Sequence, residues 1–103
     1  MNIAIDYDNT YSADPTLWNA FIGNAFLRGH KVYCVTGRNP ESNTEVLYSI
    51  GTLIGPQNCF FTSSQGKIAY MAKKGIDIHV WIDDNPDAIV RGIEIENNGV
   101  IYE

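Results

Sequence analysis

The sequence has few cysteines, few basic residues and no long run of apolar residues. Two cysteines, Cys34 and Cys59, lie in apolar stretches without the CxxC spacing of a zinc or redox site, so we expect two buried, reduced thiols. Lys and Arg number only seven, and they are scattered in a chain of net charge −5. This distribution disfavours an extended nucleic-acid surface, which needs clustered basic residues.

No apolar run approaches the roughly 18 residues of a membrane span, and no basic stretch precedes an apolar one near Met1. We therefore expect a cytoplasmic protein with no membrane contact. A length of 103 residues is that of one domain, and a hydrophobic content of 45% is typical of a globular protein.

Short apolar runs alternate with segments of helical periodicity along the chain. The expected strands are residues 2–6, 31–35, 58–62 and 78–82. The expected helices are residues 16–28, 41–54 and 67–74, with a short helical turn at 85–91. Residues 93–97 and 100–102 flank Asn98-Gly99, a pair typical of a type I′ hairpin. The alternation predicts an α/β fold with a mainly parallel sheet, helices on both faces and a C-terminal hairpin.

Polar residues follow every expected strand. In open α/β sheets, ligands bind beyond the carboxyl ends of the strands, so these residues should meet at one edge. In strand order they are Asp6 and Asp8, then Thr36, Gly37 and Arg38, then Ser63, Ser64 and Lys67, then Asp83 and Asp84. Four carboxylates, a hydroxyl and a lysine are thus expected to converge.

The charge of this group indicates a hard divalent ion. The four ionised carboxylates would place −4 in one crevice, which is costly without counter-ions. Lys67 and one Mg²⁺ would reduce the sum to −1, and a proton on Asp8 would neutralise it. Mg²⁺ suits such a site because it binds carboxylate oxygens and keeps water or phosphate oxygens as its other ligands.

The segment Asp6-Tyr7-Asp8-Asn9-Thr10 resembles the DxDxT signature of the haloacid dehalogenase-like (HAD) phosphohydrolases. The other three motifs of that family follow in the same order: Thr36 after the second strand, Lys67 at the start of a later helix, and Asp83-Asp84 after the fourth strand. The resemblance covers residues 3–87. It implies a three-layer, Rossmann-like fold and phosphatase activity.

The resemblance also implies roles for the catalytic residues. Asp6 would be the nucleophile that forms an aspartyl-phosphate. Asp8 would protonate the leaving group and later activate water, and its negative neighbours would favour its protonated form. Thr36 would donate a hydrogen bond to the phosphoryl oxygens, and Lys67 would neutralise the phosphate and the nucleophile.

Metal and phosphate ligands follow from the same resemblance. Mg²⁺ would be held by Asp6, the main-chain carbonyl of Asp8, and Asp83, with Asp84 binding directly or through water. The phosphate would be held by Thr36 and Lys67, with Gly37 and the main chain around Tyr7 as further candidates. Arg38 has two interpretations, as a contact to the substrate phosphate or as a solvated loop residue. Asp87 has two interpretations, as a stabilising residue in the first turn of a helix or as part of the metal shell.

Many relatives of this family carry a cap domain over the site, and this chain has no room for one. Only 27 residues separate Asp8 from Thr36, and four lie between the third strand and Lys67. We therefore expect residues 1–103 to form a single capless domain with an open site. The expected substrate is a phosphomonoester, such as a nucleotide or a nucleic-acid end, with Tyr7 and Tyr11 as candidates for stacking on it.

Other functions remain open at this point. The chain could be a non-catalytic or regulatory protein that binds metal and phosphate, or a phosphotransferase using the same aspartyl-phosphate. A receiver-like phosphoacceptor domain is disfavoured, because the second and third strands end in Thr36 and Thr62 rather than in the phosphorylated aspartate. The sequence leaves the oligomeric state open.

Overall fold

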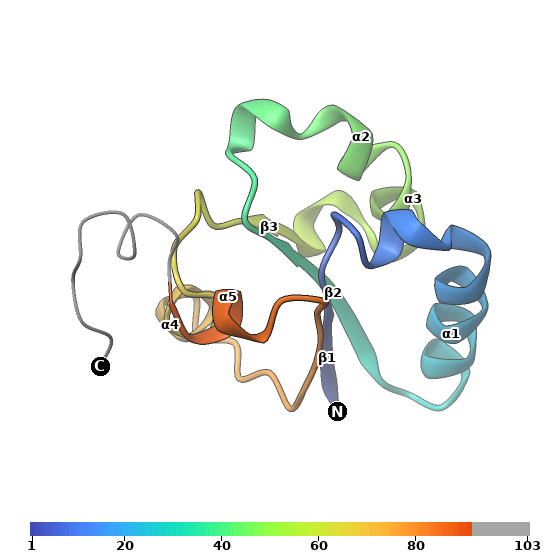
Figure 1. The fold of residues 1–103 in the computed structure, drawn as a ribbon. Coiled ribbons are helices and arrows are strands. Elements are labelled where there is room, and N and C mark those ends of the chain that lie inside the picture. The colour runs from blue at the N-terminus through green and yellow to red at the C-terminus, as the bar shows by residue number, and fades with distance from the viewer. Residues whose placement is uncertain (92–103) are drawn as a thin grey trace.

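Four parallel strands form the centre of the computed structural model, which describes residues 1–91 (Figure 1). The strands are β1 (Asn2–Ile5), β2 (Lys31–Thr36), β3 (Cys59–Phe61) and β4 (Val80–Ile82), in the sheet order β3-β2-β1-β4. All neighbouring pairs run parallel, and Ile3 of β1 is in register with Val32 and Val80. The predicted α/β fold with a parallel sheet is confirmed. The predicted hairpin of residues 93–102 lies outside the described residues.

Helices connect the strands. In chain order they are η1 (Tyr11–Ala13), α1 (Pro15–Leu27), η2 (Pro40–Ser42), α2 (Thr44–Leu47), α3 (Ile50–Ile54), η3 (Pro56–Asn58), α4 (Lys67–Lys73) and α5 (Pro86–Val90). The start of α1 shows why its sequence is helical. Asp14 accepts a hydrogen bond from the N–H of Leu17 at 3.1 Å, and Pro15 occupies the first helical position.

Alternate strand residues face opposite sides of the sheet, and each side is packed against helices (Figure 1). On one side, the buried strand residues Ile5 and Cys34 join a cluster with residues of α1, α2 and α3. On the other side, Ala4 and Val35 pack with Met71 of α4. Both cysteines are buried and free, as predicted. Burial on both faces keeps the strands rigid, so the residues that follow them are held in fixed positions.

The predicted helix of residues 41–54 is interrupted, which corrects the sequence interpretation. In its place η2, α2 and α3 follow one another, and the chain turns at Ser49, whose φ and ψ are −117° and −98°. The Ser49 hydroxyl donates to main-chain carbonyls of the preceding turn, a bond that competes with helix continuation. Val46, Ile50 and Ile54 are all buried, which explains the helical spacing seen in the sequence.

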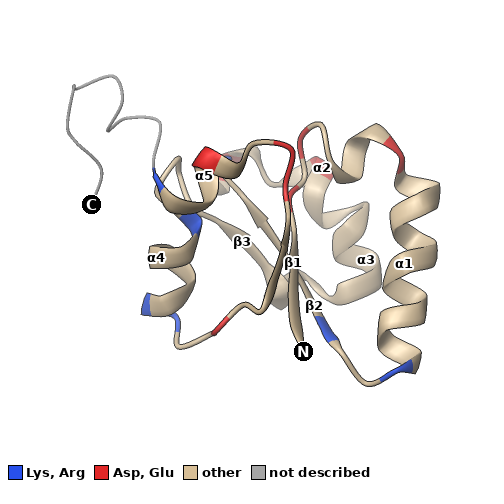
Figure 2. Cartoon of the chain, turned by 60° about the horizontal axis from the view of Figure 1, so that its bottom comes forward, with Lys and Arg blue, Asp and Glu red and all other residues tan. Residues whose placement is uncertain are grey.

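Charge is unevenly distributed over the fold. In Figure 2 acidic segments gather where β1 and β4 end, whereas most basic segments lie on α4 or at the opposite end of the sheet. None of the helices within residues 1–91 has the length and apolar character needed to cross a membrane. The acidic edge is the one at which the sequence predicted a site.

Candidate active site

A pocket of about 380 Å³ lies at the carboxyl ends of the strands. Seven of the predicted site residues line it: Asp6, Asp8, Gly37, Arg38, Lys67, Asp83 and Asp84. They come from the ends of β1, β2 and β4 and from the first residue of α4. Within residues 1–91, the predicted residues Tyr7 and Thr36 do not line this pocket.

Lys67 lies at the centre of the buried part of the site. Its Nζ donates to Asp6 Oδ1 at 2.8 Å and to Asp83 Oδ2 at 2.6 Å. Its side chain is 3% exposed, and those of Asp6 and Asp83 are 10% and 2% exposed. A lysine in the first turn of a helix is disfavoured by the helix dipole, so its two ion pairs explain its position. Lys67 thus joins the ends of β1 and β4.

Thr10 makes a second connection between the same two strand ends. Its Oγ1 lies 3.2 Å from Asp6 Oδ2 and 3.1 Å from Asp84 Oδ1, and its single proton serves both acceptors. The same oxygen accepts from the N–H of Asp84 at 3.2 Å. Thr10 is the last residue of the segment that resembles the DxDxT signature. In the structure Thr10 orients two of the site carboxylates.

Three of the carboxylates could hold a metal ion. Asp6, Asp83 and Asp84 each offer an oxygen, and these oxygens lie within 4.8 Å of one another. Together with Lys67 they carry a net charge of −2, which one divalent cation would neutralise. A donor set made only of carboxylate oxygens fits Mg²⁺. The carboxylates of Asp8 and Asp87 are not part of this group.

Asp6 is the most perturbed acid of the pocket. Burial raises its pKa from an ordinary value of 3.8 to about 6, although the hydrogen bond and charge of Lys67 act in the opposite direction. The carboxylate is therefore ionised at neutral pH while remaining largely shielded from water. This is the environment of a nucleophile whose charge is held by one cation rather than by solvent.

Asp8 points to a different partner. Its two oxygens accept hydrogen bonds from Arg38 Nε at 2.9 Å and Arg38 Nη2 at 2.8 Å. These bonds from Arg38 lower the pKa of Asp8, opposite to the expected effect of its negative neighbours. Arg38 also contacts Glu45 Oε1 at 3.2 Å and lies over the Tyr7 ring. The charge of Asp8 is thus balanced by Arg38, and a proton on Asp8 is not needed to neutralise the site.

The two tyrosines that were candidates for stacking are core residues. The rings of Tyr7 and Tyr11 are buried and stack on each other with centroids 5.8 Å apart. The Tyr11 hydroxyl donates to Asn19 Oδ1 at 2.7 Å. Neither ring is accessible to a substrate, so that expectation is wrong. Of Tyr7, the main-chain N–H remains the part expected to bind phosphate.

Thr36 is also more buried than its expected role requires. It is 1% exposed, and its Oγ1 accepts a hydrogen bond from the N–H of Arg38 at 3.3 Å. The hydroxyl therefore orders the chain that leaves β2, and through it the position of Arg38. The pocket is lined on that side by Gly37 and Arg38.

The loop between β3 and α4 supplies two lining residues, of which the sequence had indicated Ser64 but not Gln65. Ser64 and Gln65 face the pocket, and Ser64 N–H donates to Gly37 O at 2.9 Å. Ser63 and Ser64 have φ values of 53° and 67°, in the left-handed region that residues other than glycine rarely adopt. Such strained pairs are concentrated at functional sites, but Ser-Ser carries no sequence signal for this conformation.

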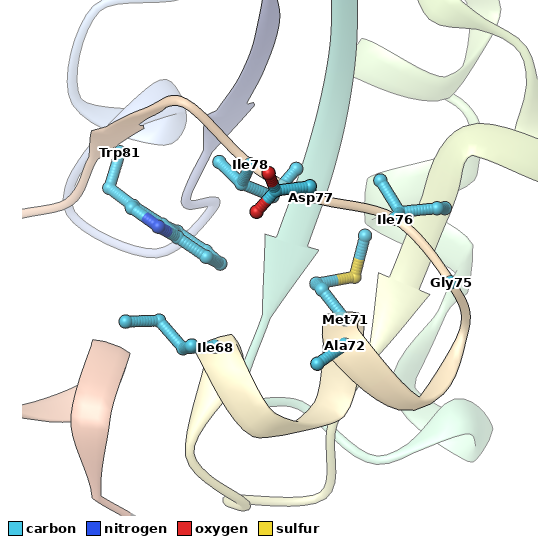
Figure 3. A pocket seen from close by; sticks show the side chains of 8 residues that line it. All are labelled: Ile68, Met71, Ala72, Gly75, Ile76, Asp77, Ile78 and Trp81. Atoms are coloured by element: carbon cyan, nitrogen blue, oxygen red, sulfur yellow. The ribbon is translucent and has the colours of Figure 1, made fainter.

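An apolar pocket of about 480 Å³ lies away from this chemistry (Figure 3). It is formed by side chains of α4, of the segment before β4 and of β4 itself, including Met71, Ile78 and Trp81. Asp77 is its only acidic or basic lining residue, and it is exposed. A single exposed carboxylate is no cluster of metal ligands or catalytic groups, so the candidate active site is the acidic pocket.

No protein-family model, curated protein or solved structure matches this chain. What the structure shows is an α/β fold with a four-stranded parallel sheet and an acidic cluster at the carboxyl ends of its strands. Any functional assignment therefore depends on the arrangement of the residues in the pocket.

Proposed function

We propose that the protein is a HAD-like, Mg²⁺-dependent phosphohydrolase that cleaves a phosphomonoester through an aspartyl-phosphate on Asp6. The observation that supports this most strongly is the contact of Lys67 with both Asp6 and Asp83. It brings together a nucleophile, a cation that can stabilise a phosphoryl group, and a metal ligand. The order of the four motifs along the chain agrees with this assignment.

In the first step, an oxygen of Asp6 attacks phosphorus, and the bond from phosphorus to the leaving-group oxygen breaks. That oxygen keeps the electron pair and takes a proton from the carboxyl group of Asp8. Lys67 stabilises the negative charge on the nucleophile and on the phosphoryl oxygens. Mg²⁺, when bound by Asp6, Asp83 and Asp84, would supply positive charge opposite those same oxygens.

In the second step, Asp8 removes a proton from water, whose oxygen attacks phosphorus, and the bond from phosphorus to Asp6 breaks. The ionised state that Arg38 favours suits this role as a base. The first step requires a protonated Asp8, so Arg38 must release it when substrate binds. Phosphoryl oxygens are acceptors for the same N–H groups, and they can take the place of the Asp8 carboxylate.

A screen of phosphomonoesters in the presence of Mg²⁺ tests the proposal. We expect phosphate release by the wild-type chain, and a loss of more than about a thousandfold in Asp6→Asn. Asp87→Asn is the matched control, because Asp87 is exposed and lies outside the metal-binding group. Turnover that survives in Asp6→Asn would refute the assignment of Asp6 as the nucleophile.

Binding of phosphate and Mg²⁺ without turnover of any ester would instead favour the non-catalytic alternative. Transfer of the phosphoryl group to an added alcohol in preference to water would favour a phosphotransferase. Transfer would keep the same catalytic residues, because hydrolysis and transfer share the attack by Asp6.

A further inference from the structure

Two more pockets continue from the candidate active site across η2 and α2. The first has a volume of about 610 Å³ and shares Gly37, Arg38 and Ser64 with the acidic pocket. Its remaining lining residues are Asn39, Ser42, Thr44 and Glu45. Every side chain in this pocket is polar, so it suits a ligand rich in hydroxyl groups.

The second pocket, of about 430 Å³, shares Thr44 with the first. Leu47, Tyr48 and Pro56 give it an apolar, aromatic wall. Tyr48 is 80% exposed, which is unusual for a tyrosine. An exposed aromatic ring beside a pocket offers a flat surface on which another ring can stack.

Two asparagines in this region keep their side-chain amides available. Asn39 and Asn43 stand at the N-terminal caps of η2 and α2, where an asparagine side chain usually accepts a main-chain hydrogen bond. Neither makes such a bond here. Asn39 lines the polar pocket and Asn43 lines the aromatic one, so each amide can donate to and accept from a ligand.

The three pockets are linked through shared lining residues, and we call the row that they form the trough. Its chemistry changes from one pocket to the next. A cation and metal-binding carboxylates come first, hydroxyl and amide groups follow, and an exposed aromatic ring comes last. This is the order of phosphate, sugar and base in a nucleotide. We propose that the substrate is a nucleoside 5′-monophosphate, with its ribose in the polar pocket and its base against Tyr48. The phosphate end of this assignment rests on the proposed function.

The charge of the chain favours a free mononucleotide over the end of a nucleic-acid strand. Every additional phosphate would approach a molecule of net charge −5 whose acidic residues gather around this pocket (Figure 2). Among the described residues that line the two outer pockets, Arg38 is the only basic one, so a second phosphate would find no further cation there. A single phosphate can be matched by Lys67 and a divalent ion.

The test compares kcat/KM for four phosphomonoesters with the full chain and Mg²⁺. The probes are adenosine 5′-monophosphate, ribose 5-phosphate, 4-nitrophenyl phosphate and a 5′-phosphorylated oligonucleotide. We expect kcat/KM for adenosine 5′-monophosphate to exceed that for ribose 5-phosphate by at least about tenfold, because stacking of the base on an aromatic ring contributes that much to binding. Tyr48→Ala should remove this preference by lowering kcat/KM for adenosine 5′-monophosphate toward the value for ribose 5-phosphate.

Phe26→Ala is the matched control, because Phe26 is an exposed aromatic residue on α1 that does not line the trough. Equal rates with and without the base, or a preference that survives Tyr48→Ala, would overturn the nucleotide assignment while leaving the phosphatase intact. Faster hydrolysis of the oligonucleotide would also overturn it.

Calorimetric binding of adenosine 5′-monophosphate to Asp6→Asn separates the two proposals. Binding that weakens about tenfold in Asp6→Asn with Tyr48→Ala supports the trough even if the wild-type chain hydrolyses nothing. Binding that does not depend on Tyr48 overturns the trough whatever the catalytic result.

Discussion

Lys67 and Arg38 are two of the three basic residues that line the acidic pocket, and they are held in different ways. Lys67 contacts Asp6 and Asp83 in a setting where all three side chains are at most 10% exposed. Arg38 contacts Asp8 and Glu45, whose side chains are 50% and 71% exposed. Both cations make short, charge-assisted bonds, but only those of Lys67 are shielded from water.

This difference separates a fixed from an exchangeable part of the site. If a buried lysine moved away from its carboxylates, buried charges would be left without a partner. Lys67 therefore fixes the positions of the ends of β1 and β4 relative to each other. An arginine whose acidic partners are exposed loses little when its partner changes, because water screens and replaces the bond. In the proposed mechanism Arg38 can therefore exchange Asp8 for a phosphate, whereas Lys67 keeps its contacts with Asp6 and Asp83.

The largest effect is expected from Lys67→Met. Removing one partner of a buried ion pair costs about 3–5 kcal/mol, because Asp6 and Asp83 are left without their counter-charge. The free energy of unfolding, measured by urea titration with a chelator at neutral pH, should fall by that amount. Lys73→Met is the control, since Lys73 is exposed in the last turn of the same helix. A loss no larger than that of the control would contradict the fixed role of Lys67.

A smaller effect, with a defined pH dependence, is expected from Asp6→Asn. Because the pKa of Asp6 is raised from 3.8 to about 6, this group stabilises the fold fully below pH 3.8. That contribution is lost as the pH rises through about 6, and it amounts to at most about 3 kcal/mol. Relative to the wild-type chain, Asp6→Asn should therefore gain stability between pH 4 and pH 7.5, measured with a chelator. A constant difference, or a change of opposite sign, would show that burial does not dominate at Asp6.

The smallest effect is expected from the exposed pair. Because Arg38 lowers the pKa of Asp8, the stabilisation by Asp8 is present above its ordinary pKa of 3.8 and is lost as the pH falls below it. A double-mutant cycle with Asp8→Asn and Arg38→Gln should give a coupling energy below about 1 kcal/mol at pH 7, reduced further by salt. A coupling of about 3 kcal/mol, unaffected by salt, would place Arg38 in the same category as Lys67.

The fold followed from the sequence where burial decides local structure. Apolar runs such as residues 31–35 are buried strands, and the capping pair Asp14-Pro15 begins α1 as its chemistry requires. The break at Ser49 was not predicted, because Val46, Ile50 and Ile54 keep helical spacing across it. Periodicity reports which face is buried, and it does not register a hydroxyl that bonds to the preceding turn.

The positions of the site residues at one edge of the sheet could also be predicted from the sequence. Parallel strands bring their carboxyl ends to one edge, so the convergence of Asp6, Lys67 and Asp83 could be read from the order of the elements. Side-chain directions could not be read in this way. The turn of Asp8 toward Arg38 and the burial of the Tyr7 ring depend on which neighbour each side chain meets after folding.

The central claim is that Asp6 receives a phosphoryl group beside Lys67 and Asp83. A crystal structure of the full chain with Mg²⁺ and beryllofluoride, a phosphoryl mimic, tests it most directly. We predict beryllofluoride on a carboxylate oxygen of Asp6, a fluoride within hydrogen-bond distance of Lys67, and the ion held by Asp6 and Asp83. Beryllofluoride on another residue, or a metal bound away from these carboxylates, would contradict the account.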